Sequence, residues 1–165
     1  MSEPINAQPI ALAEGDGEAR WFLDSLAIIK ASGNKTGGRL AVVEYLSPKG
    51  SGSPLHMHTR EDEWFHVLEG ELAFWVGGQL IQAKAGAFAY GPRDIPHTFV
   101  VVSERARYIV GASPAGFDEF VRAASVPAKT LTLPPADAPP PDPQRLAGLA
   151  AKFGIEVLGP PGIPD

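Results

Sequence analysis

Three of the four histidines in this chain follow a pattern that suits metal binding. His56 and His58 are two residues apart, Glu63 follows five residues later, and His97 comes after one further hairpin-sized stretch. Because side chains at positions i and i+2 of a strand point to the same face, His56 and His58 can direct two imidazoles at one point. Three neutral nitrogens and one carboxylate suit a divalent first-row metal with coordination positions left open. The pattern therefore predicts a metal centre for chemistry and not only for structural support.

The elements that must position these residues are predicted to be strands. After an N-terminal arm over residues 1–17, short runs of β-branched and aromatic residues alternate with Gly- and Pro-rich turns from residue 18 to 113. Many short strands with regular turn signals are typical of a β-sandwich or barrel. The expected strand segments are residues 20–30, 40–45, 64–68, 71–76, 79–83, 88–90, 98–102 and 107–110.

Residues 114–165 differ and are expected to form a helical and proline-rich extension packed on the barrel. Residues 115–124 and 144–152 have the spacing of amphipathic helices. Between them, residues 127–143 hold seven of the 17 prolines, which suits an extended connection. This tail is too short and too rich in proline to make a core of its own, so the chain is expected to have one domain.

Composition argues against several classes of function. The chain has 165 residues, 44% of them hydrophobic, and a net charge of −5, which argues against nucleic acid or an anionic membrane surface as a partner. It has no cysteine, which excludes disulfides and thiolate metal ligands. Residues 1–13 lack the pattern of a signal peptide, and no apolar run approaches the ~18 residues of a membrane span. The composition thus favours a cytoplasmic protein with no membrane partner.

The spacing around the histidines resembles the first sequence motif of the cupin superfamily. That motif runs Gly, five residues, His-x-His, three or four residues, Glu, six residues, Gly. Its fixed positions are occupied here by Gly50, His56, His58, Glu63 and Gly70.

The second cupin motif is matched by Gly86, Pro92 and His97, fifteen residues further along. Asp94 stands where the family has glycine, and Val101 stands where it has asparagine. These departures fall at turn and strand positions, away from the ligand residues. The resemblance covers roughly residues 38–112.

This resemblance implies an all-β cupin fold, the double-stranded β-helix or jelly-roll barrel, with short C-terminal helices. It also implies one divalent transition metal held by His56, His58, Glu63 and His97. The identity of the metal stays open among Ni, Mn, Fe, Co, Cu and Zn, which all accept such ligands.

Residues close to the ligands have other expected roles. Glu61 and Asp62 compete with Glu63 and could belong to a solvated loop, but the motif's spacing to Gly70 selects Glu63. His66 is three residues from Glu63, so it is expected on the opposite face of the strand, in a structural role or at a subunit contact.

Aromatic residues supply the candidate substrate pocket. Phe65 and Phe99 share the strand parity of the ligands, and Tyr45 is a further candidate. Phe117 and Phe120, on the expected helix after the barrel, could cap its mouth or pack on its exterior.

Within the cupins, residues 62–71, 91–99 and 113–120 are similar to single-barrel relatives of flavonol (quercetin) dioxygenases. The resemblance implies O₂-dependent cleavage of a flavonol-like or other enolisable aromatic substrate, with Glu63 as the base. The alternatives are a non-oxidative cyclase, isomerase or lyase acting on a secondary-metabolite intermediate, and a non-catalytic small-molecule-binding cupin.

A homodimer is expected, because a jelly roll has sheet edges to protect. Trp64, His66 and residues 21–29 are the candidate contacts.

Overall fold

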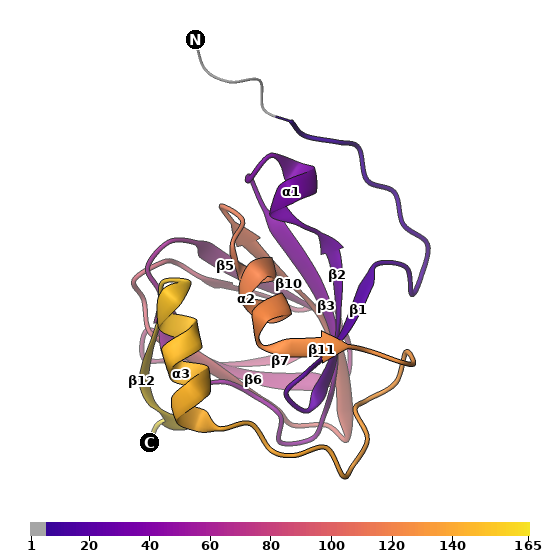
Figure 1. Ribbon diagram of the computed structural model, residues 1–165. Helices are drawn as coiled ribbons and strands as arrows, with labels where there is room; N and C mark the ends of the chain where they lie inside the picture. The colour runs from indigo at the N-terminus through magenta and orange to yellow at the C-terminus, as the bar shows by residue number, and fades with distance from the viewer. Residues whose placement is uncertain (1–5) are drawn as a thin grey trace.

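Two antiparallel sheets make up most of the structure, a computed structural model that describes residues 6–165 (Figure 1). The seven-stranded sheet has the order β11-β1-β2-β3-β10-β5-β8, and the five-stranded sheet has the order β12-β4-β9-β6-β7. The elements are β1 (Glu18–Phe22), β2 (Ser25–Ala31), α1 (Gly33–Thr36), β3 (Ala41–Pro48), β4 (Pro54–His58), β5 (Asp62–Glu69), β6 (Glu71–Val76), β7 (Gln79–Lys84), β8 (Phe88–Gly91), β9 (His97–Val101), β10 (Arg105–Ser113), α2 (Phe117–Ala123), β11 (Ser125–Pro127), α3 (Pro143–Lys152) and β12 (Ile155–Pro161).

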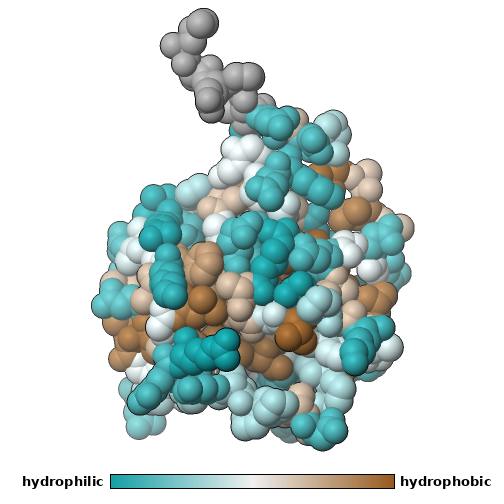
Figure 2. All heavy atoms as spheres, viewed as in Figure 1, coloured by the Kyte–Doolittle hydropathy of each residue, from teal (hydrophilic) through white to brown (hydrophobic). Residues whose placement is uncertain are grey.

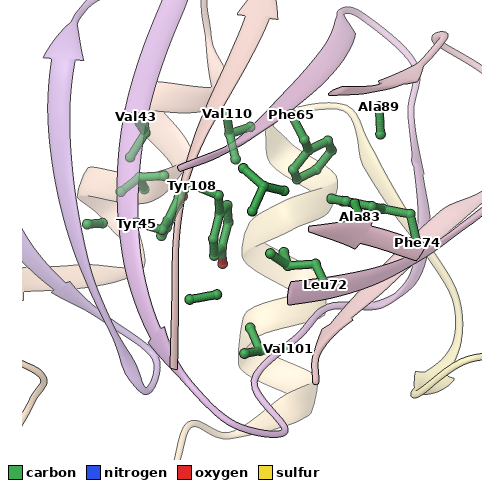
Figure 3. Close-up of a cluster of buried hydrophobic side chains, with 14 of the residues drawn as sticks. Val43, Tyr45, Phe65, Leu72, Phe74, Ala83, Ala89, Val101, Tyr108 and Val110 are labelled. Carbon is green, nitrogen blue, oxygen red and sulfur yellow. The ribbon is translucent and has the colours of Figure 1, made fainter. Parts of the chain in front are cut away.

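Alternating burial explains why these segments form strands around one core. Along β3, every second residue from Ala41 to Ser47 is buried, and β5 alternates in the same way. Because successive strand side chains point to opposite faces, this period of two buries one face of each strand. The inward residues form a cluster between the two sheets that includes Tyr45, Phe65 and Tyr108 (Figure 3). This architecture confirms the predicted all-β jelly roll.

The expected strand segment 20–30 is in fact a hairpin of two strands. The turn between β1 and β2 falls at Leu23 and Asp24, and Leu23 has a left-handed φ of 55°. Glycine and proline, the residues that usually mark a turn, do not occur in this segment. The sequence therefore carried only the weak signal of Asp24 and Ser25, and the pairing of β1 with β2 imposes the turn.

The tail after residue 113 completes both sheets as well as forming helices. The helices α2 and α3 lie where helical spacing predicted them, and they contact one another on the same side of the molecule (Figure 1). The side chain of Asp142 caps α3 by accepting hydrogen bonds from the backbone N–H groups of Gln144 and Arg145. Strand β11 pairs with β1, and β12 pairs with β4. Strand β4, which carries His56 and His58, therefore lies between β12 and β9 in its sheet.

The structure describes the expected N-terminal arm from residue 6 onward. Residues 1–5 of the expected arm lie outside the described residues, and the following segment is held at Ala7, which forms a bridge to Thr36. Within residues 6–165, none of the helices has the length and apolar character needed to cross a membrane.

Candidate metal centre

Three strands of the two sheets bring the four predicted ligands together. His56 and His58 lie on β4, Glu63 lies on β5, and His97 begins β9 directly opposite His56. His56 and His58 share the inward face because they are two residues apart on one strand. All four residues are buried, with His56 the most accessible at 9%.

One nitrogen of each imidazole and one oxygen of Glu63 converge on a common point. The His97 Nε2 atom lies 2.8 Å from the Glu63 Oε2 atom, and the His58 Nε2 atom lies 3.0 Å from the same oxygen. The Nε2 atoms of His56 and His58 are 3.2 Å apart. The four potential ligand atoms all lie within 4.8 Å of one another.

The other nitrogen of each ring is already used, which fixes the orientation of the rings. The Nδ1 atom of His56 donates to the carbonyl of Pro54 at 2.8 Å, and that of His97 donates to the carbonyl of Ile95 at 3.2 Å. The His58 Nδ1 atom donates to the Glu61 carboxylate at 2.8 Å. With their Nδ1 atoms engaged as donors, the rings direct their three Nε2 atoms at the centre, and these atoms would be the ligands once they carry no proton. This donor set fits a divalent transition metal.

Glu61 contacts the cluster, although the sequence analysis treated it only as a competitor for Glu63 or as part of a solvated loop. It is 2% exposed, and it contacts the outer nitrogen of His58 rather than the common point. The adjacent Asp62 lies at the surface and pairs with Arg93 at 3.2 Å. The only sequence signal was the three-residue spacing from His58 to Glu61, which is too common to be specific.

The cluster is electrostatically coupled. Burial opposes the charge on His58, but the Glu63 carboxylate and hydrogen bonds to Glu61 and Glu63 raise the pKa of its imidazole to about 10. Burial and the neighbouring His97 lower the pKa of His56 to about 3. Burial alone would raise the pKa of the Glu63 carboxyl, yet the charge of His58 and hydrogen bonds from His58 and His97 hold it well below its usual range. The metal-free cluster therefore favours an ionised Glu63 next to a protonated His58.

His66 and Asp94 lie close to the ligands in the sequence but are not part of the cluster. His66 lies on the outer face of β5, opposite Phe88 and Ile109, and is not part of the cluster. Asp94, which replaces the glycine of the second motif, has a φ of 63° and so adopts the left-handed conformation for which glycine is usually chosen. The turn before His97 therefore keeps its shape without the glycine.

A largely apolar cavity of about 770 Å³ adjoins the cluster, with His56 and Glu63 in its wall. The three predicted pocket residues, Tyr45, Phe65 and Phe99, also line it. So do Phe117 and Phe120, which supports the interpretation that α2 caps the mouth. Residues of α3 and β12 complete the wall, and Figure 2 shows apolar surface on the face where α3 lies.

Two stacked tyrosines in this wall differ in their hydrogen bonding. The rings of Tyr45 and Tyr108 are 5.4 Å apart and 17° from parallel (Figure 3). The Tyr108 hydroxyl is 2.9 Å from the hydroxyl of Ser47, whereas the buried Tyr45 hydroxyl has no partner among residues 6–165. Burial raises the pKa of both phenols, so both are neutral at physiological pH.

Comparison with known proteins agrees with the fold and the site. The cupin domain family matches residues 42–111. A curated relative, quercetin 2,3-dioxygenase from Bacillus subtilis (strain 168), is 32% identical over 119 residues, which is 72% of this chain. The match covers only 35% of that relative, so the chain spans about a third of the relative's length.

Solved structures show the same fold at lower identity. An RmlC-like cupin from Shewanella frigidimarina NCIMB 400 superposes with a TM-score of 0.59 at 21% identity, covering 70% of this chain and 99% of that one. KdgF from Halomonas sp. superposes with a TM-score of 0.53 at 21% identity, covering 58% and 84%. With two antiparallel sheets, a converging His₃Glu cluster and these relatives, the chain contains a cupin domain over residues 42–111.

Proposed function

We propose that this cupin is a metal-dependent dioxygenase that cleaves a flavonol-like or other enolisable aromatic substrate. The observation that carries the proposal is the convergence of three Nε2 atoms and one carboxylate oxygen beside a largely apolar cavity, whose wall includes His56 and Glu63. The Bacillus relative, whose name is quercetin 2,3-dioxygenase, supports this choice of reaction over the others that the same ligand set can serve.

In this proposal His56, His58, Glu63 and His97 hold one divalent metal, whose identity among Ni, Mn, Fe, Co, Cu and Zn stays open. When bound, such a metal supplies a Lewis acid for an acidic hydroxyl oxygen and a redox centre for O₂. A metal held by these four residues would lie next to the cavity, because His56 and Glu63 form part of its wall.

Glu63 is proposed to be the base as well as a ligand. Its Oε2 atom accepts hydrogen bonds from His58 and His97, so the carboxylate is held in place and its pKa is low in the metal-free protein. No other carboxylate among the described residues belongs to both the cluster and the cavity wall. It would take the hydroxyl proton of a substrate, which leaves the substrate as an enolate and Glu63 protonated.

The aromatic wall would orient a flat substrate and exclude water. Phe65 and Phe99 lie 5.5 Å apart on facing sheets, and Phe99 makes an edge contact with Tyr108. Such rings bury a large apolar surface while leaving the polar end of a ligand to the cluster. Tyr45, Phe65 and Phe99 are therefore the proposed substrate-contacting residues.

Replacement of Glu63 by Gln tests the central step. Glutamine keeps an oxygen of similar reach but loses the basicity, so turnover of quercetin should fall ~10²–10⁴-fold. Metal content should fall much less, because three histidines remain. Oxygen uptake by metal-loaded protein and metal analysis of the same samples give the two readouts.

Four outcomes would contradict parts of the proposal. Equal losses of metal and turnover would make Glu63 a ligand only. Retained turnover in metal-bearing Glu63→Gln protein would remove its role as a base. Substrate conversion without oxygen uptake would favour the non-oxidative cyclase, isomerase or lyase, and tight binding without conversion would favour a binding cupin.

We also propose that two copies of the chain associate. On the outer face of β8, an edge strand of its sheet, Phe88 is 62% exposed and Tyr90 is 49% exposed. Trp64 stacks on Phe88, and His66 lies beside it. An exposed aromatic edge of this kind is a surface that a second sheet edge can cover. Of the other candidate contacts, Trp21 is already held by the chain's own tail, since its indole N–H donates to the carbonyl of Thr132.

A further inference from the structure

The cavity has a second polar end, far from the metal centre along the same sheet. Glu63 is in register with Ala112 of β10, which is in register with Ala41 of β3. Ser47 lies on the same inward face of β3, six residues further on. The row that holds Ser47 is therefore set apart from the row that holds Glu63 along the strands. The rows between them carry largely apolar side chains.

At this far end, two buried serine hydroxyls meet one carboxylate. Ser51 donates to the Oδ1 atom of Asp24 at 2.7 Å, and Ser25 donates to the same oxygen at 2.9 Å. All three residues line the cavity that holds His56 and Glu63 in its wall. The left-handed conformation of Leu23, uncommon for a residue with a branched side chain, places Asp24 at this position.

The hydrogen bonds at this end run in one direction. Because the Ser25 proton goes to Asp24, Ser47 must donate to Ser25 across their 2.7 Å contact. Tyr108 must then donate to Ser47 across 2.9 Å. Each hydroxyl has only one proton, so every donor in the chain is committed toward Asp24.

A ligand that reaches this end of the cavity therefore meets a hydrogen-bond acceptor. The hydrogen bonds of residues 6–165 that involve Asp24 all use its Oδ1 atom, which leaves Oδ2 for a partner. Asp24 has no ion pair with a cation of the described chain. A carboxylate accepts and cannot donate, so the matching group on a ligand is a hydrogen-bond donor.

A second observation indicates that polar ligand atoms enter this cavity. The Tyr45 hydroxyl lies in the wall between the two ends, is buried, and has no protein partner in the described structure. An unpaired buried hydroxyl destabilises the folded state, and native proteins rarely contain one without a purpose.

We propose that Asp24, supported by Ser25 and Ser51, is a recognition site for a hydroxyl group on the end of the substrate remote from the metal centre. This inference rests on the proposed function and narrows its substrate class. The favoured ligand is an elongated polyphenol with an acidic enol-type hydroxyl at one end and a phenolic hydroxyl at the other. A molecule with the enol end alone leaves Asp24 unpaired.

Two flavonols that differ at the remote end test this site. Quercetin carries phenolic hydroxyls on its outer rings, and 3-hydroxyflavone does not. Binding of each to metal-loaded protein is measured without oxygen, by fluorescence titration, in the wild type, Asp24→Asn and Ser51→Ala. In Asp24→Asn, the amide oxygen can still accept from Ser25 and Ser51, but an N–H donor replaces the free acceptor.

Wild-type protein should bind quercetin about tenfold more tightly than 3-hydroxyflavone. Asp24→Asn should weaken quercetin binding ~3–10-fold and leave 3-hydroxyflavone binding within about twofold, since Asp24 is exposed to solvent on one side. Ser51→Ala should act in the same direction with a smaller effect. Asp137→Asn, which removes the same charge from an exposed position outside the cavity, is the matched control and should change neither.

The difference between the two ligands carries the result, since it cancels general effects of the substitution. Equal weakening of both flavonols by Asp24→Asn, or no effect on either, would overturn the site. Oxygen uptake, recorded separately in air, separates the two proposals: uptake without the ligand-dependent difference keeps the dioxygenase and removes the Asp24 site. A ligand-dependent difference without oxygen uptake keeps the Asp24 site and removes the dioxygenase. A wild type that binds neither flavonol overturns both proposals.

Discussion

Individual residues outside the four predicted ligands control how the cluster is presented. His58 is held by Glu61 through a hydrogen bond between two side chains that are almost fully buried. That bond keeps a proton on Nδ1 and leaves Nε2 for the centre. Partners of this kind typically contribute 10–100-fold to metal affinity.

Replacing Glu61 by Ala should therefore lower metal affinity ~10–100-fold, because the His58 ring loses its anchor. Competition with a metal-binding dye measures the effect. Asp62→Ala is the adjacent control, since Asp62 pairs only with Arg93 at the surface, and it should leave the affinity unchanged. An affinity of Glu61→Ala protein equal to that of the wild type would show that packing alone orients His58.

The paired tyrosines should respond in opposite ways to loss of their hydroxyls. Tyr108→Phe leaves the fully buried Ser47 without one of its partners and should lower the free energy of unfolding by about 1–2 kcal/mol. Tyr45→Phe removes a hydroxyl that has no partner, so it should be neutral or stabilising by up to about 1 kcal/mol. Urea denaturation of both variants without ligand is the measurement. A loss in Tyr45→Phe as large as that in Tyr108→Phe would mean that the fold itself uses the Tyr45 hydroxyl.

Among the elements, α2 joins the tail to the cavity, and one buried carboxylate anchors it. Asp118 is fully buried and accepts hydrogen bonds from the backbone N–H groups of Gly33 and Gly116 at 3.0 and 3.1 Å. Phe117, the preceding residue, makes an edge contact with the His58 ring at 5.8 Å. The anchor at Asp118 therefore also fixes the position of the aromatic lining beside the cluster.

Loss of this anchor should destabilise the protein. Asp118→Ala leaves two backbone donors unpaired and should lower the free energy of unfolding by about 2–4 kcal/mol. Glu119→Ala removes a carboxylate from the same helix that is half exposed and pairs only with Arg122, so it should cost less than 1 kcal/mol. Thermal and urea denaturation compare the two variants. Similar stability in both would contradict the anchoring role.

At the scale of the whole molecule, metal uptake should be coupled to proton release. In the metal-free protein, the Glu63 charge and hydrogen bonds to Glu61 and Glu63 outweigh burial and raise the His58 pKa to about 10. Near pH 7 this imidazole therefore keeps a proton that a metal must displace, and only above pH 10 would the proton leave unaided.

The apparent metal affinity should accordingly rise as pH rises, up to about tenfold per pH unit between pH 6.5 and 8. Calorimetric titration in two buffers of different ionisation enthalpy should count about one proton released per metal bound. A pH-independent affinity with no proton release would mean that the cluster is already deprotonated before the metal arrives.

The sequence by itself determined the residues of the cluster and the class of fold. The spacing of two residues between His56 and His58 and the period-two pattern along the strands are local properties, and strand geometry converts them directly into a shared face. The residue types and spacing also pointed to Glu63 and His97, the likeness to the cupin motifs supported both, and the structure brings all four together. Helical spacing likewise placed α2 and α3.

Only the tertiary structure decided which of two similar residues is buried and which partner each of them contacts. Glu61 and Asp62 look alike in the sequence, but the chain after His58 turns the first into the core and the second toward Arg93. Tyr45 and Tyr108 are also alike, yet only one meets Ser47.

The pairing of β12 with β4 had no local signal, and the turn at Leu23 had only the weak signal of Asp24 and Ser25. The physical reason is common to all of these cases. Burial and hydrogen-bond partners are set by segments far apart in the chain, such as Ser47 and Tyr108, 61 residues apart, and no local period encodes such contacts.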